Sequence, residues 1–216
     1  MVICDGIKIN NLHSHHDFDL CFKQRNISLP EKKSIRETVP FMNGYYDFSA
    51  LNGAPAWDER SVEYVFDLIA ETPRKLDEYA SRVLDWLCNA HNVDIFDDTM
   101  PDYHWHGSYD GCSLSWDESG LHVEISVEFV VYPFKIANVA TTWQMQAGEY
   151  TIRNEGMTVA PIVYSDASAA IQIGTHVTSI PANVETKLAL DLERGDNTVI
   201  ITGDGTLQFS YYKEVL

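Results

Sequence analysis

The sequence predicts a mainly β protein: an α+β N-terminal domain, in which one helix packs on a β-sandwich or barrel, followed by a C-terminal β-sandwich. Apolar and polar residues alternate along most of the chain, which is the period of half-buried strands. Residues 73–90 instead place apolar residues at steps of three and four, the period of a helix. Beyond about residue 138 the strands are short and separated by turns, as in sandwiches. We therefore expect two domains, residues 1–137 and 138–216.

The segment before the helix is expected to form short strands and turns. Pro40 ends one strand, and Asn43-Gly44 is a turn signal that leads into the next. Residues 51–55 are typical of a loop. In the second strand, alternation places Phe18, Leu20 and Phe22 on one face. The expected strands cover residues 7–10, 17–22, 34–39, 45–48 and 61–68.

The helix has a clear predicted start. Thr72 is a suitable N-cap, and Pro73 suits the first helical position because its missing N–H would have no partner there. We expect the apolar face to pack on the strands. That face comprises Leu76, Tyr79, Ala80, Val83, Leu84, Leu87 and Cys88.

A long hairpin is expected after the helix. A loop over residues 97–102 precedes a strand over residues 103–109, and Asp110-Gly111 is interpreted as a turn. The alternation over residues 121–132 predicts a strand whose partner begins near Leu114, with the turn at residues 118–120.

The C-terminal part is predicted to contain only strands and turns. Turns are expected at residues 154–156, 195–197 and 203–205. The expected strands cover residues 149–153, 161–164, 169–173, 187–192, 198–202 and 207–212.

Charge and composition exclude several classes of function. The chain has 32 Asp and Glu residues against 15 Lys and Arg, a net charge of −17, so specific nucleic-acid binding is not expected. No apolar run reaches the roughly 18 residues of a membrane span, and the N-terminus lacks a signal-peptide pattern. The four cysteines form no C-x-x-C pair, and we expect reduced thiols in a protein made in the cytoplasm.

The histidines suggest a metal site only weakly. His13, His15 and His16 lie beside Asp17 and Asp19 in the sequence. His104 and His106 would share one face of a strand, near Asp110 or Cys112, but no second ligand pair at a fixed spacing accompanies them. Packing or surface histidines are the alternative, and we predict no metal and no cofactor.

Catalysis has no positive signal in the sequence. The nucleophile elbow and the glycine-rich phosphate loops are absent, and a carboxylate pair is expected by chance among so many acids. We therefore do not expect an enzyme. Carbohydrate or receptor binding remains an alternative, because exposed aromatic rings can stack on sugars, although such rings more often pack in cores. The candidate rings are Trp57, Trp105, Trp116, Trp143, Tyr109 and Tyr211.

The order of motifs resembles the distal tail (Dit) proteins of long-tailed, non-contractile phages and prophages of Gram-positive bacteria. The family pattern V-P-G-R-x-G-x-x-D appears over residues 39–47, with Phe41 and Met42 in place of its Gly and Arg. An N-terminal turn at residues 4–7, a tyrosine-bearing strand after the helix and an aromatic-Pro corner follow the family order. The motif residues are Val39, Pro40, Asn43, Gly44, Asp47, Tyr103 and Pro133.

The resemblance implies a structural role in a phage tail. Residues 1–137 would form a homo-oligomeric ring, a hexamer in the family pattern, and residues 138–216 a galectin-like β-sandwich without the galectin sugar-binding motifs. The ring would join the tail tube protein to the tail-tip or baseplate proteins. The implied location is the virion tail tip, after assembly in the bacterial cytoplasm.

Overall fold

The computed structural model describes residues 5–49 and 56–216, and the chain divides into two compact units between Pro133 and Phe134. The sequence places this boundary after residue 137. The difference arises because β10 (Lys135–Ala137) pairs with β19 (Glu214–Val215), so these residues belong to the second unit. No helix among the described residues has the length and apolarity needed to cross a membrane. Cys4 and the predicted loop at residues 51–55 lie outside the described residues.

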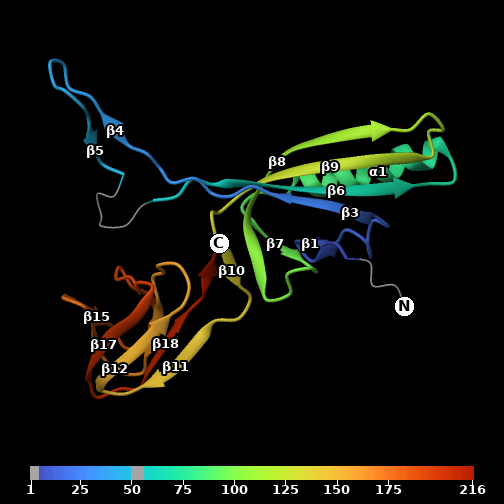
Figure 1. Cartoon of the computed structure of the whole chain (residues 1–216). Coiled ribbons are helices and arrows are strands. Elements are labelled where there is room, and N and C mark those ends of the chain that lie inside the picture. The colour runs from blue at the N-terminus through green and yellow to red at the C-terminus, as the bar shows by residue number, and fades with distance from the viewer. Residues whose placement is uncertain (1–4, 50–55) are drawn as a thin grey trace. The chain divides into compact units, whose positions relative to one another are not determined.

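The first unit is built on an antiparallel sheet with the strand order β2-β1-β7-β8-β9-β6-β3. The long strands β6, β8 and β9 form its centre, and β9 lies between the other two (Figure 1). The strands are β1 (Ile7–Ile9), β2 (Leu12–His13), β3 (Cys21–Ile27), β6 (Arg60–Ile69), β7 (Val93–Asp97), β8 (Tyr103–Trp116) and β9 (His122–Val131).

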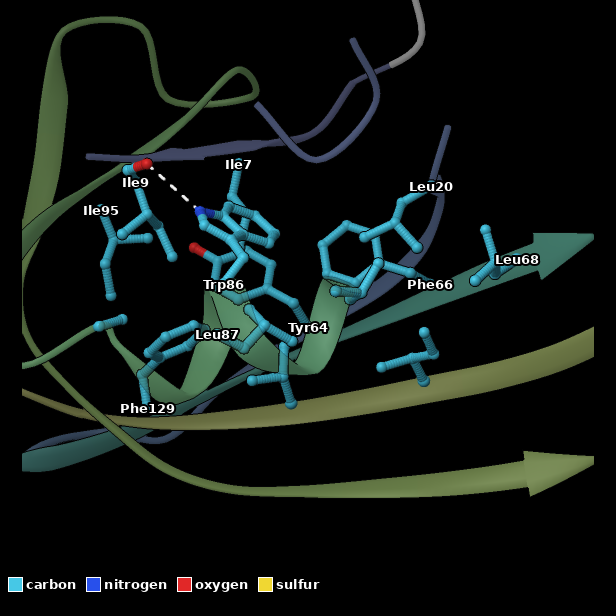
Figure 2. Packing of buried hydrophobic residues seen from close by; sticks show 14 of the residues in the cluster. Ile7, Ile9, Leu20, Tyr64, Phe66, Leu68, Trp86, Leu87, Ile95 and Phe129 are labelled. Atoms are coloured by element: carbon cyan, nitrogen blue, oxygen red, sulfur yellow. Dashed lines mark hydrogen bonds between the residues drawn. The ribbon is translucent and has the colours of Figure 1, made fainter. Parts of the chain in front are cut away.

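Helix α1 (Pro73–Cys88) covers one face of this sheet and begins as predicted. The Thr72 hydroxyl accepts a hydrogen bond from the Lys75 backbone N–H at 3.3 Å. The buried face is rotated from the predicted one, since Tyr79 and Cys88 are exposed and Trp86 is buried. The Trp86 indole N–H donates to the backbone oxygen of Ile9 at 3.4 Å, which ties the helix to β1 (Figure 2).

The core of the first unit lies between α1 and the sheet (Figure 2). Alternation along β6 and β9 places every second side chain in this layer, as the sequence predicts. Its largest fully buried side chains include Tyr64, Phe66, Trp105 and Phe129.

Three predictions in the first unit are wrong in detail. The strand expected at residues 17–22 begins only at Cys21, because the chain turns through Asp19 at φ 55°, although Phe18 and Leu20 still pack in the core. Asp110-Gly111 is a β-bulge within continuous β8 rather than a turn. Strands β2 and β7 are missing from the prediction.

The second unit is a β-sandwich, as predicted. Among the described residues it contains two four-stranded antiparallel sheets, β11-β18-β13-β16 and β12-β17-β14-β15, whose apolar side chains form a separate core. The strands are β11 (Thr141–Met145), β12 (Gly148–Asn154), β13 (Ile162–Ser165), β14 (Ala169–Ile173), β15 (His176–Ile180), β16 (Thr186–Lys187), β17 (Gly195–Gly203) and β18 (Leu207–Tyr211).

Two predictions for this unit need correction. Residues 195–197 were expected to turn but begin β17, where they pair with residues 152–154 of β12. The strand expected over residues 187–192 is limited to Thr186–Lys187, because Leu188 and Leu192 enter the core from irregular backbone. Strands β10, β11, β15 and β19 are additional to the prediction.

A separate hairpin extends from the first unit between β3 and β6. Its strands, β4 (Arg36–Glu37) and β5 (Tyr46–Asp47), pair only with each other among the described residues. We call residues 31–49 the arm. At its base, Lys32 bridges to Trp57. Figure 1 shows the arm leaving the sheet at the end opposite the loop that joins β6 to α1.

Candidate assembly surface

The seven motif residues do not form one site. The arm holds five of them near its tip, Tyr103 begins β8, and Pro133 is the last residue of the first unit. The arm residues are Val39, Pro40, Asn43, Gly44 and Asp47. The arm is therefore the part of the motif set in which neighbouring residues can act together.

The tip of the arm is a tight turn with an unusual residue. The Met42 N–H donates to the Val39 carbonyl at 3.1 Å, and Pro40 occupies the second position of the turn. Phe41 occupies the third position with φ 69°. A type II turn requires a positive φ at this position, and glycine is the residue that adopts it without strain. The turn of this chain instead presents a strained phenylalanine.

The arm carries several apolar side chains that stay exposed in the described chain. Phe41 is fully exposed, with a relative accessibility of 110%. The exposed group also includes Ile35, Val39, Tyr45, Tyr46 and Phe48. Exposed apolar groups concentrated on one projecting element are typical of contact surfaces.

The arm is held in shape by its own polar contacts. The Arg36 guanidinium lies 4.5 Å from the centroid of the Tyr45 ring and 3.5 Å from the Asp47 carboxylate. Hydrogen bonds from Ser49, and secondarily the charge of Arg36, lower the pKa of Asp47. The Phe48 N–H donates to the Ile35 carbonyl at 2.8 Å. The shape of the arm therefore does not depend on burial against the sheet.

The face of the central sheet opposite the core is acidic, a feature not predicted from the sequence. Glu63 of β6 lies opposite Glu128 of β9, and Asp67 lies opposite Glu124. Like charges in such cross-strand pairs repel each other. The alternation of acids in β6 and β9 was the available signal. This face is unsuited to binding a polyanion.

Local partners relieve part of this repulsion. Ser126 donates to Glu63, and this contact, followed by one from Asn26, lowers the pKa of Glu63. The Lys23 ammonium donates a hydrogen bond to Glu124, and this bond is the main reason that the pKa of Lys23 is raised. The Nε2 atom of His122 lies 2.9 Å from Asp67.

The histidines take part in carboxylate contacts. His13 Nε2 lies 2.9 Å from Asp98. His106 Nδ1 lies 2.7 Å from Asp94, and His104 Nε2 lies 3.6 Å from the same carboxylate. Their neighbour is therefore Asp94 of β7, a strand that was not predicted from the sequence. Among residues 5–49 and 56–216, no group of three or more His, Cys, Asp or Glu side chains is arranged to hold a metal ion.

The aromatic side chains considered for sugar stacking are scattered. Trp105 and Tyr211 are buried, and Trp143 stacks on Tyr211 with ring centroids 5.7 Å apart. Tyr109 packs against the first core. Of the six candidates, only Trp116 is exposed. These rings do not form a shared platform on the described surface.

Comparisons with known proteins identify the fold. No family model and no curated protein matches the chain. Among solved structures, the chain is similar to the Dit (gp 19.1) protein of phage SPP1, described as a paradigm of the hub adsorption apparatus in phages that infect Gram-positive bacteria. The TM-score is 0.73 at 12% identity, over 98% of this chain and 99% of that chain.

A second solved structure shows a weaker likeness. It is the baseplate of phage P2 in its activated conformation with Ca, with a TM-score of 0.44 at 9% identity, over 97% of this chain and 98% of that chain. The likeness to SPP1 Dit spans both units, so it includes the helix-covered sheet and the sandwich. The chain therefore has the Dit fold, which confirms the fold that the motif order suggested.

Proposed function

We propose that this protein is a distal tail protein of a phage or prophage, a structural component that joins the tail tube to the tail tip or baseplate. The observation that carries the proposal is the likeness to SPP1 Dit over nearly the full length of both chains. A match that extends through two differently built units is more specific than a shared sandwich alone, because sandwiches serve many functions.

The active form in this proposal is a homo-oligomeric ring of about six copies, formed by the first unit. A ring needs a head-to-tail interface, in which one surface of a copy meets a different surface of the next. The arm is suited to be one of these two surfaces. Its exposed apolar side chains lie on a hairpin that pairs with no other strand of the described chain. The second unit is then left for contacts with other tail-tip proteins.

The acidic sheet face is compatible with a tail through which DNA passes. Glu63, Asp67, Glu124 and Glu128 would repel phosphates rather than hold them. The proposed partners are therefore the tail tube protein and the tail-tip proteins, and the proposed location is the virion tail tip.

The mass of the purified protein in solution tests the ring. We would measure it by light scattering after size exclusion over a wide concentration range, and image the peak by negative-stain electron microscopy. The expected result is a closed particle of about six copies with a central opening. A monomer at every concentration would contradict the ring.

A further inference from the structure

We propose that Phe41 is the anchor by which the arm of one copy holds a second copy of this chain. The inference rests on the proposed ring and names the residue that closes its interface. It combines three independent properties of the arm tip: backbone strain, exposure and low charge.

The backbone at Phe41 argues against a purely structural role. At φ 69° a bulky residue is strained, whereas glycine would adopt the same conformation freely. Strain that persists at one residue is a reason to look for a function of its side chain.

The side chain of Phe41 is presented rather than packed. It is fully exposed, and the neighbouring Val39 and Tyr45 are about half exposed. A fully exposed aromatic side chain such as Phe41 can bury roughly 200 Å² on contact, and each partly exposed apolar side chain of the arm about half of that or less. Together they offer on the order of 600 Å² of apolar surface. One side of a typical stable interface buries about 800 Å², so the arm could supply most of one.

Charge favours a second copy as the partner. Each copy has a net charge of −17, so two copies repel each other over most of their surfaces. Between Thr38 and Phe48, Asp47 is the single charged residue, and Arg36 lies beside it. The tip is therefore a place where two such chains can approach each other at little electrostatic cost.

Two substitutions separate the ring of Phe41 from the backbone of its turn. Phe41→Gly removes both the aromatic side chain and the strain, whereas Phe41→Ala removes the side chain and keeps a Cβ. We expect both to raise the dissociation constant of the assembly at least roughly tenfold, as for an anchor residue. The urea midpoint of monomeric Phe41→Gly should be unchanged or higher than that of the wild type. Val177→Ala, at an exposed apolar residue of the second unit, is the matched control and should assemble as the wild type does.

Each outcome has a distinct meaning. If the wild type forms rings and both Phe41 variants form them with the same affinity, the anchor is wrong and the ring stands. If the wild type is monomeric at every concentration, the ring itself fails. Loss of assembly with Phe41→Ala but not with Phe41→Gly would also overturn the anchor, because the turn rather than the aromatic ring would then matter.

A photo-crosslinker identifies the partner directly. Replacing Phe41 with p-benzoylphenylalanine and irradiating the assembled protein should give a product of twice the chain mass. The same replacement at Tyr79, on the exposed side of α1, is the control and should give much less. Crosslinks from position 41 that stay within one chain, or that in phage particles reach only a different protein, would overturn the proposal.

Discussion

The central sheet and the arm both belong to the first unit, yet the sheet buries most of its apolar residues whereas the arm leaves them exposed. In β6 and β9 the apolar side chains at every second position lie in the core with α1, and Phe129 has no exposed surface. In the arm, Phe48 and its neighbours stay partly accessible, because among the described residues β4 and β5 pair only with each other. Alternation thus predicts which residues share a face, but it does not predict what lies against that face.

The largest difference expected between the two regions is in hydrogen exchange. Strand β6 is paired on both sides, so its amides should open only with nearly global unfolding. Strands β4 and β5 pair only with each other, so in the monomer their amides should exchange at least about a thousandfold faster. Exchange detected by mass spectrometry measures both. Equal protection in the monomer would show that the arm is packed on the unit, and protection gained on assembly would sharpen its assignment as a contact.

Removing one aromatic side chain from each region should give very different losses of stability. Phe129→Ala leaves a cavity in the core and should lower the free energy of unfolding by about 3–5 kcal/mol. Phe48→Ala removes an exposed ring that stacks on Tyr46, and should change it by less than about 0.5 kcal/mol. Urea denaturation of the monomer measures both. A large loss in the second variant would contradict the separation of the regions.

One arginine–aspartate pair from each region offers a similar contrast. Asp97 is buried and accepts hydrogen bonds from Arg25 at 2.6 Å and from the Tyr64 hydroxyl at 3.1 Å. Asp97→Ala should cost about 3 kcal/mol, because it leaves both donors without this partner. Asp47→Ala breaks an exposed pair and should have little effect on the same urea transition. Equal losses would refute the burial argument.

The smallest expected effect is a change in the stability of the fold with pH, which arises from a tyrosine packed against the first core. Burial, followed by the nearby Cys88 and Cys112, raises the pKa of Tyr109 to about 12. The unfolded chain releases this proton near pH 10 and the folded chain keeps it, so stability should fall as the pH rises from about 10 to 12. Tyr109→Phe should reduce that fall. Urea midpoints at several alkaline pH values measure it, and an unchanged slope would contradict the assignment.

Local sequence patterns correctly predicted the elements that do not depend on segments remote in the chain. Thr72-Pro73 starts the helix, and the alternation over β9 matches its burial residue by residue. The missed features depend on partners that are remote in the chain. Strand β7 is short and is formed by pairing with β1 and β8, and the bulge at Asp110-Gly111 is defined by its register against β9.

The candidate surface was predictable only in part. The motif over residues 39–47 was recognised in the sequence, and the departure at Phe41 was visible there. That Phe41 is strained and fully exposed required backbone angles and accessibility. The acidic sheet face escaped detection because Glu63 and Glu128 are 65 positions apart and meet only through strand pairing.

By itself, the sequence determined the mainly β class, the single helix, the two-part organisation and the acidic character, because periodicity and composition are local or additive properties. The tertiary structure alone decided which strands are neighbours, which apolar face is covered by α1, and that the arm is left without a partner in its own unit. Pairing and burial depend on segments that are distant in the chain, and no local pattern encodes which of them come together.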